Sequence, residues 1–145
     1  MKKIRIILFG LLVLGLGIAI WKITIQEPRS GIVEKDLVNE FNKIDHPSNV
    51  KLLSLSSSHK ANQAIVVAKY DSTLAYNEIL EHYKEKLSKL GWKYDSEQKV
   101  TDWGEDLGGQ LARFTKNNYT LRLQYAGDQA NYGWNYALSL SWGLT

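Results

Sequence analysis

The sequence contains no cysteine, and its 145 residues include only three histidines. Without cysteine there is no disulfide framework, no thiolate metal site, no cysteine nucleophile and no lipid-modified cysteine anchor. Three histidines scattered along the chain do not supply the ligands of a zinc site. Glycine-rich phosphate loops of the dinucleotide-binding and P-loop types are also absent. The sequence therefore predicts no metal and no cofactor.

Residues 30–145 carry no excess of positive charge, although the formal net charge of the whole chain is +3. Residues 1–29 carry five basic residues against Glu27 alone, whereas residues 30–145 carry 13 basic and 14 acidic residues. A nucleic-acid-binding domain needs lysine and arginine clustered on the domain itself. We therefore expect no nucleic-acid partner.

One long apolar run occupies the N-terminal part, where every residue from Ile6 to Trp21 is apolar or glycine. As a helix, residues 4–25 would span about 33 Å, which matches a bilayer core of about 30 Å. Arg5 and Lys22 lie at the ends of the run, where their charges reach the lipid headgroups. The basic residues before the run orient this end toward the cytoplasm. The pattern predicts a signal-anchor that crosses the cell membrane once, with the lipid bilayer as its partner.

A cleaved signal peptide is the alternative for this segment. Gly17 and Ala19 place small residues at the two positions that matter for a cut before Ile20. The run is longer than the usual ~7–15 apolar residues of a signal peptide, which favours a retained anchor. The expected division is a cytoplasmic tip and anchor over residues 1–25, a stalk over residues 26–31 and an extracytoplasmic domain over residues 32–145.

Hydrophobic periodicity assigns helices and strands to the outer domain. Helical spacing runs over residues 32–44 and, more clearly, over residues 74–90. One of the polar residues 71–73 is expected to cap the second helix, and Gly91 suits the left-handed position after it. Strands are expected at 50–56, 64–70, 92–95, 110–116, 119–126 and 132–142, with polar loops over 57–63 and 96–109.

The last expected strand alternates strictly between aromatic or aliphatic residues and small or polar ones over residues 132–142. Strict alternation indicates a sheet that is covered on one face and open to water on the other. The amphipathic helix over residues 74–90 is the natural cover. The fold class is therefore predicted to be α+β, with an N-terminal transmembrane helix followed by an antiparallel β-meander that has amphipathic helices packed on one face.

The asparagine turn at residues 117–118 predicts the register of the strands on either side. A two-residue turn pairs Lys116 with Tyr119, and this register sets Arg113 directly opposite Arg122 on the open face. Like charges opposite each other destabilise a sheet by up to ~1 kcal/mol. Neither of the two strands carries an acidic residue that would neutralise the arginines.

The next hairpin is expected to add a third polar residue beside Arg113 and Arg122. Pairing Tyr125 with Tyr132 would place Asn135 beside Arg122. The row of Arg113, Arg122 and Asn135 is the candidate site for a protein partner or an anionic envelope ligand, because the forked guanidinium group suits carboxylates and phosphates. The alternative is that the two arginines extend into water at little energetic cost.

The polar loop expected over residues 96–109 carries a further candidate, Trp103. A tryptophan in such a loop either packs over the edge of the core or anchors a binding partner. Asp102, Glu105 and Asp106 lie beside it, but they lack the regular spacing and the closing glutamate of a calcium loop. We therefore predict no metal site there.

Three classes of function follow from these patterns. The leading interpretation is a non-enzymatic, membrane-anchored domain that binds a partner protein, an envelope polymer or an anionic ligand outside the membrane. The second is a cell-envelope hydrolase that would use the Ser56–His59 segment or the Asp102–Asp106 carboxylates. The third is a spacer domain without a ligand.

Overall fold

The computed structural model describes residues 29–102, 104–128 and 132–143. The predicted anchor over residues 4–25 and the candidate residue Trp103 lie outside this part of the chain. Within it, no helix is long and apolar enough to cross a membrane.

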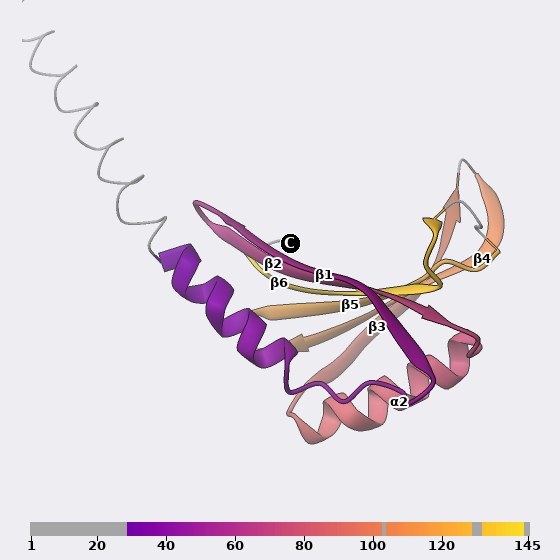
Figure 1. Ribbon diagram of the computed structural model, residues 1–145, viewed down its shortest axis with the longest axis horizontal. Helices are drawn as coiled ribbons and strands as arrows, with labels where there is room; N and C mark the ends of the chain where they lie inside the picture. The colour runs from indigo at the N-terminus through magenta and orange to yellow at the C-terminus, as the bar shows by residue number, and fades with distance from the viewer. Residues whose placement is uncertain (1–28, 103, 129–131, 144–145) are drawn as a thin grey trace, which may run out of the picture.

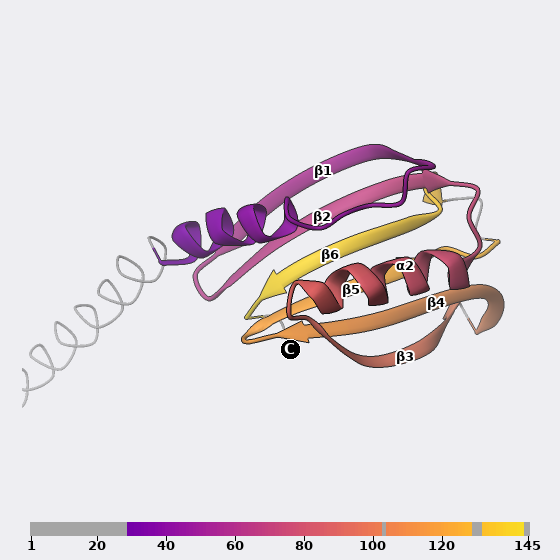
Figure 2. The same ribbon diagram turned by 90° about the horizontal axis from the view of Figure 1, so that it is seen from below.

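A six-stranded antiparallel sheet forms the body of the domain, with the strand order β1-β2-β6-β5-β4-β3. A helix over residues 29–41 and α2 (Tyr76–Lys89) lie on the same side of this sheet (Figures 1 and 2). The predicted α+β class, with helices on one face, is confirmed. The strands are β1 (Val50–Lys60), β2 (Gln63–Ser72), β3 (Lys93–Asp102), β4 (Glu105–Lys116), β5 (Tyr119–Tyr125) and β6 (Tyr136–Trp142).

The connections make the sheet a hairpin joined to a four-stranded meander. After the β1–β2 hairpin, α2 carries the chain to the opposite edge of the sheet, where β3 begins. The meander β3-β4-β5-β6 then returns across the sheet, and β6 pairs with β2. The single continuous meander of the sequence prediction is therefore interrupted once.

The hairpin predicted around residues 57–63 is present, but the polar loops predicted over 57–63 and 96–109 are too long, because most of their residues belong to strands. β1 continues to Lys60, and β3 and β4 form a long hairpin. β1 and β3 are the two edges of the sheet. An edge strand meets water along its unpaired side, so serine-rich and charged sequences are compatible with it.

The start of α2 differs from the prediction of a side-chain cap at residues 71–73. Ala75 occupies the N-cap position, and the Glu78 carboxylate accepts a hydrogen bond of 2.8 Å from its backbone N–H. Residues 71 and 72 still belong to β2, which is why they cannot cap the helix. The Ser72 hydroxyl accepts instead from the Leu74 N–H at 3.1 Å.

The end of α2 follows the prediction. Gly91 has a φ of +81° and donates its N–H to the Ser88 carbonyl at 3.0 Å. The Trp92 N–H returns to the Leu87 carbonyl, also at 3.0 Å, which completes a Schellman motif. The indole of Trp92 is thereby directed into the core, where only 3% of the residue is exposed.

The core lies between the helices and the inner face of the sheet. The predicted apolar face of α2 is confirmed, because four of its residues are buried and the two at its ends, Tyr76 and Leu90, are partly buried against the core. Inward-facing residues of the strands complete the layer. The core residues include Leu37, Phe41, Val66, Ile79, Leu80, Tyr83, Leu87, Phe114, Leu121, Leu123, Leu138 and Leu140.

A hydrogen-bonded cluster of histidine and tyrosine lies within this core. The Tyr83 hydroxyl lies 2.9 Å from His46 Nδ1 and 3.1 Å from the Tyr136 hydroxyl. The Tyr70 hydroxyl lies 3.2 Å from His46 Nε2, and its ring stacks on that of Tyr136. Burial lowers the pKa of His46 and raises the pKa of Tyr136 to about 12. The cluster is therefore uncharged near neutral pH.

We expect the domain to lose stability as the pH falls below about 6.5, the ordinary pKa of histidine. The pKa of His46 is lower in the folded chain than in the unfolded chain, since burial outweighs the opposing effect of Asp45. The unfolded chain therefore takes up the proton first, and the stability present above the unfolded pKa is lost in the window below it. Urea unfolding at about pH 7.5 and about pH 5 measures this loss. The His46→Gln variant should show a clearly smaller drop, and an equal drop in both proteins would contradict the assignment.

Candidate anion-binding face

The open face of the sheet lies away from both helices and is concave (Figure 1). It contains a hollow of about 420 Å³, a volume within the usual range of small-ligand sites. Four neighbouring strands, β3 to β6, supply its lining. All but one of the lining side chains are polar, which suits a polar or charged ligand: Ser96, Gln98, Leu111, Arg113, Arg122, Gln124 and Ser139.

Arg113 and Arg122 line this hollow from its two middle strands. They are direct cross-strand partners on β4 and β5, as the turn at residues 117–118 predicted. Asn117 at that turn has a φ of +53°, which asparagine tolerates better than most residues. Ser96 continues the row on β3, and Ser139 continues it on β6.

The charge of Arg113 is partly compensated by an acidic residue that sequence reasoning did not place. The Asp95 carboxylate lies 3.5 Å from Arg113 Nε. A register shift between Tyr94 and Ser96 puts Asp95 at an irregular position of β3, the strand beside β4. The Arg113 Nε atom is buried and has no hydrogen-bond partner. The predicted strand ranges 110–116 and 119–126 contain no acidic residue, as expected, and the compensating carboxylate comes from the neighbouring strand β3.

Further positive charge lies on the same face of the sheet. Lys69 on β2 is the cross-strand partner of Ala137, and Lys93 on β3 is the partner of Thr115. Neither lysine, nor Arg122, forms an ion pair within the described part of the chain. The hollow thus combines one partly compensated guanidinium group with one that has no ionic partner.

Asn135 does not belong to this row, and its predicted place beside Arg122 is wrong. β6 pairs with β5 four residues further along than expected, so that Tyr125 faces Tyr136 and Arg122 faces Ser139. Asn135 lies just before β6 and joins neighbouring strands. Its side-chain oxygen accepts from the Ser72 N–H at 2.8 Å, and its backbone N–H donates to the Tyr70 carbonyl at 2.9 Å. Asn135 is a structural residue.

A glycine could have revealed this shift. Gly133 has a φ of +64° and interrupts the strand predicted over residues 132–142. A shift of four residues keeps each side chain on its original face, because strand side chains alternate with a period of two. The alternation therefore remained correct while the register was not.

The carboxylates near residue 103 lie on the β3–β4 hairpin rather than in a long loop. Asp106 forms an ion pair of 3.0 Å with Lys99 and accepts a hydrogen bond from the Gly108 N–H. These two contacts lower the pKa of Asp106. In residues 29–102, 104–128 and 132–143, no three histidine or acidic residues gather as metal ligands.

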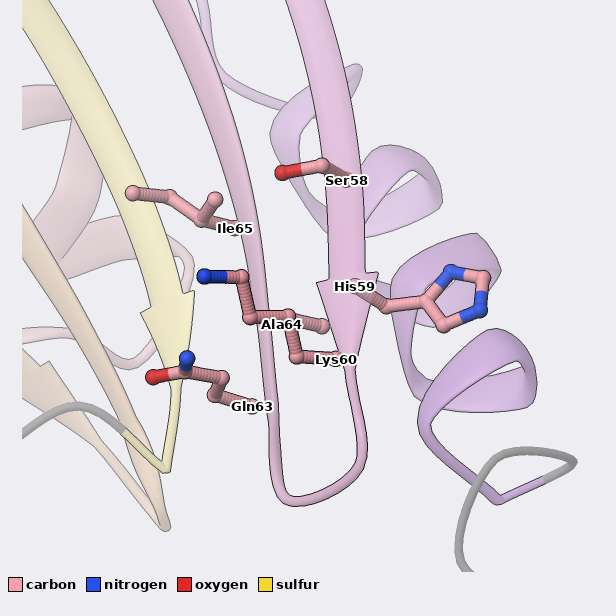
Figure 3. Close-up of a pocket in the computed structure, with 6 residues that line it drawn as sticks. All are labelled: Ser58, His59, Lys60, Gln63, Ala64 and Ile65. Carbon is pink, nitrogen blue, oxygen red and sulfur yellow. The ribbon is translucent and has the colours of Figure 1, made fainter. Parts of the chain in front are cut away.

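The Ser56–His59 segment, the other catalytic candidate, belongs to strand β1. Figure 3 shows His59 turned toward the helix over residues 29–41, whereas Ser58 points to the other side of the strand. His59 Nδ1 lies 2.5 Å from the Glu34 carboxylate. Hydrogen bonds from Ser57 and His59 lower the pKa of Glu34, and the bond from Ser57 has the larger effect. Because Ser57 bonds to the glutamate and not to the histidine, the geometry does not activate a serine nucleophile.

No family model matches the chain, and the comparisons with curated proteins and with solved structures gave no match either.

Proposed function

We propose that this protein is a single-pass, membrane-anchored binding domain that holds an anionic group on the concave face of its sheet. The anion is a carboxylate or phosphate of a partner protein or an envelope polymer. The observation that carries the proposal is the direct opposition of Arg113 and Arg122 inside a polar hollow.

The energetics of the arginine pair support binding. Opposed like charges cost a sheet up to ~1 kcal/mol, and an anion between them turns this repulsion into two favourable contacts. Guanidinium groups also donate paired hydrogen bonds to carboxylate and phosphate oxygens. Asp95 lies on the Nε side of Arg113, at 3.5 Å and without a hydrogen bond. The terminal nitrogens of that group form no ion pair within the described residues, so they can meet a ligand.

The position in the cell rests on the N-terminal sequence. The apolar run from Ile6 to Trp21, with basic residues before it, supports an anchor over residues 4–25 whose outer side carries the domain. A domain held at a membrane meets partner proteins, envelope polymers and soluble anions at that surface, all of which offer carboxylates or phosphates.

The Arg113→Ser/Arg122→Ser double variant tests the proposal. We expect the full-length wild-type protein to bind immobilised polyglutamate or polyphosphate, and the double variant to bind at least tenfold more weakly. Each hydrogen-bonded charge contributes about 1.5–3 kcal/mol, which makes tenfold a lower bound. The stability of the domain should stay unchanged or increase, because the repulsion is removed as well.

The Lys84→Ser/Lys86→Ser variant is the matched control. It removes the same amount of charge from α2, on the opposite side of the sheet, where both lysines form surface ion pairs. Equal weakening in both variants would show that binding depends on net charge alone. Unchanged binding by the arginine variant would contradict the proposed site.

A further inference from the structure

The two ends of the sheet differ in charge. At one end, which we call the basal end, three of the six strands have a lysine as their terminal residue there: Lys60 is the last residue of β1, Lys116 the last of β4 and Lys93 the first of β3. The helix over residues 29–41 also begins there (Figure 2). The Arg29 guanidinium lies 5.9 Å from the ring centre of Trp142, the last residue of β6.

Most acidic side chains at the basal end are already paired. Glu34 bonds to His59, Glu40 to Lys43 and Lys116, and Glu85 to Lys89. Four basic side chains form no ion pair within the described residues, and Asp36 is the acidic side chain left beside them. The four are Arg29, Lys35, Lys60 and Lys93.

The opposite end of the sheet has the reverse character. The exposed charges there without an ion pair among the described residues are Asp71, Glu78, Glu105 and Asp128, against Lys51 and Lys69. The domain therefore carries a charge separation along its strands, with the positive side at the basal end.

An exposed apolar residue accompanies the basal charges. Ile32, in the first turn of the described helix, is 62% exposed, more than any other large hydrophobic side chain of the described residues. Arg29 and Lys35 lie three positions before and after it, on neighbouring parts of the helix surface. Basic residues around an exposed apolar side chain are typical of surfaces that contact lipid headgroups.

We propose that the basal end rests on anionic lipid headgroups, so that the strands stand away from the bilayer and the concave face opens sideways. This inference rests on the anchor in the proposed function. Only residues 26–28 separate the predicted span from the described helix, so Arg29 lies within about 14 Å of the span's end. Charge complementarity then selects the basal end over the acidic end as the contact surface. Each unpaired cation strengthens contact with an anionic bilayer roughly fivefold, and salt screens this attraction.

Site-specific fluorescence in vesicles tests the contact, since the chain has no native cysteine. The full-length protein carries one dye at either Asn118→Cys or Glu105→Cys. Asn118 lies at the basal end but on the turn between β4 and β5, away from the anchored helix, and Glu105 lies at the opposite end. All vesicles contain nitroxide-labelled lipid. The neutral vesicles are otherwise made of phosphatidylcholine, and in the anionic vesicles about one-third of the lipid is phosphatidylglycerol.

We expect strong quenching of the Asn118 dye in the anionic vesicles and at least threefold less in neutral vesicles or high salt. The Glu105 dye should remain unquenched in all of them. Lys60→Glu/Lys93→Glu should abolish the quenching, whereas Lys51→Glu/Lys69→Glu, an equal charge change away from the basal end, should not. The proposal would be overturned if quenching did not depend on the charge of the lipids, or if the Asn118 and Glu105 dyes were quenched equally.

The same vesicles separate this inference from the proposed function. Flotation after carbonate extraction reports the anchor, and polyglutamate binding reports the arginine face. A protein that floats and binds polyglutamate, but whose Asn118 dye is unquenched, disproves the basal contact alone. A protein that fails to float disproves the anchor, and the inference falls with it.

Discussion

The Gly127→Ala variant is expected to lower the free energy of unfolding by about 3 kcal/mol. Gly127 has a φ of +65°, and a Cβ added there would collide with the Leu107 carbonyl oxygen and lie 2.6 Å from the Gly108 carbonyl carbon. These neighbours are backbone atoms that cannot rotate away. The positive φ contributes about 1–2 kcal/mol of the loss, and the forced displacement contributes the remainder. Urea unfolding of the detergent-solubilised protein measures it.

Gly133→Ala is the matched control for this prediction. Gly133 has almost the same φ, +64°, but a Cβ added there meets no atom within 4 Å. We therefore expect a loss of only about 1 kcal/mol, caused by the backbone conformation alone. Equal losses in the two variants would show that the close backbone contact at Gly127 does not contribute to the loss of stability.

The close approach at Gly127 matters for the candidate site because it positions the β3–β4 hairpin. The next residue, Asp128, donates its N–H to the Leu107 carbonyl at 2.8 Å. These contacts join the segment after β5 to the outer part of β4. β3 and β4 supply Gln98, Leu111 and Arg113 to the hollow, so we expect Gly127→Ala to weaken polyglutamate binding as well.

The Tyr83→Leu variant is expected to destabilise the domain by about 4 kcal/mol. Tyr83 is fully buried, and its hydroxyl contacts both His46 and Tyr136. Leucine leaves a cavity where the ring was and deprives both neighbours of a hydrogen-bond partner. Comparing thermal and urea unfolding with the wild type measures the effect.

Tyr83→Phe separates packing from hydrogen bonding. Phenylalanine keeps the ring but removes the hydroxyl, so the expected loss is about 1–2 kcal/mol. If phenylalanine cost as much as leucine, the hydrogen-bonded cluster would be the main source of stability. If phenylalanine cost nothing, the contacts to His46 and Tyr136 would have no net value.

The elements that could be predicted from the sequence are those with a strong local signal. α2 repeats its apolar residues at helical spacing, and its end at Gly91 follows from the left-handed conformation that glycine adopts easily. The turn at residues 117–118 leaves one register for β4 and β5, and therefore placed Arg113 opposite Arg122 correctly. In these cases residues close together in the sequence determine the local structure.

The features that could not be predicted depend on partners far along the chain. The outer parts of β1 and β3 read as loops because edge strands need no apolar alternation, and their pairing with β2 and β4 is decided by the rest of the sheet. Asp95 reaches Arg113 only through an irregularity in β3. The Glu34–His59 contact joins a helix to a strand that begins nine residues after that helix ends. None of these contacts leaves a periodic signal.

The position of β6 between β2 and β5 has a consequence for how the chain folds. The last strand in the sequence is an interior strand of the sheet, and it alone joins the β1–β2 hairpin to the meander. The hairpin and the meander can each form from local contacts. The pairing of β2 with β6 joins strands that are separated by about half the chain, and such long-range pairing forms slowly. On a ribosome, the sheet therefore cannot close until β6 has emerged.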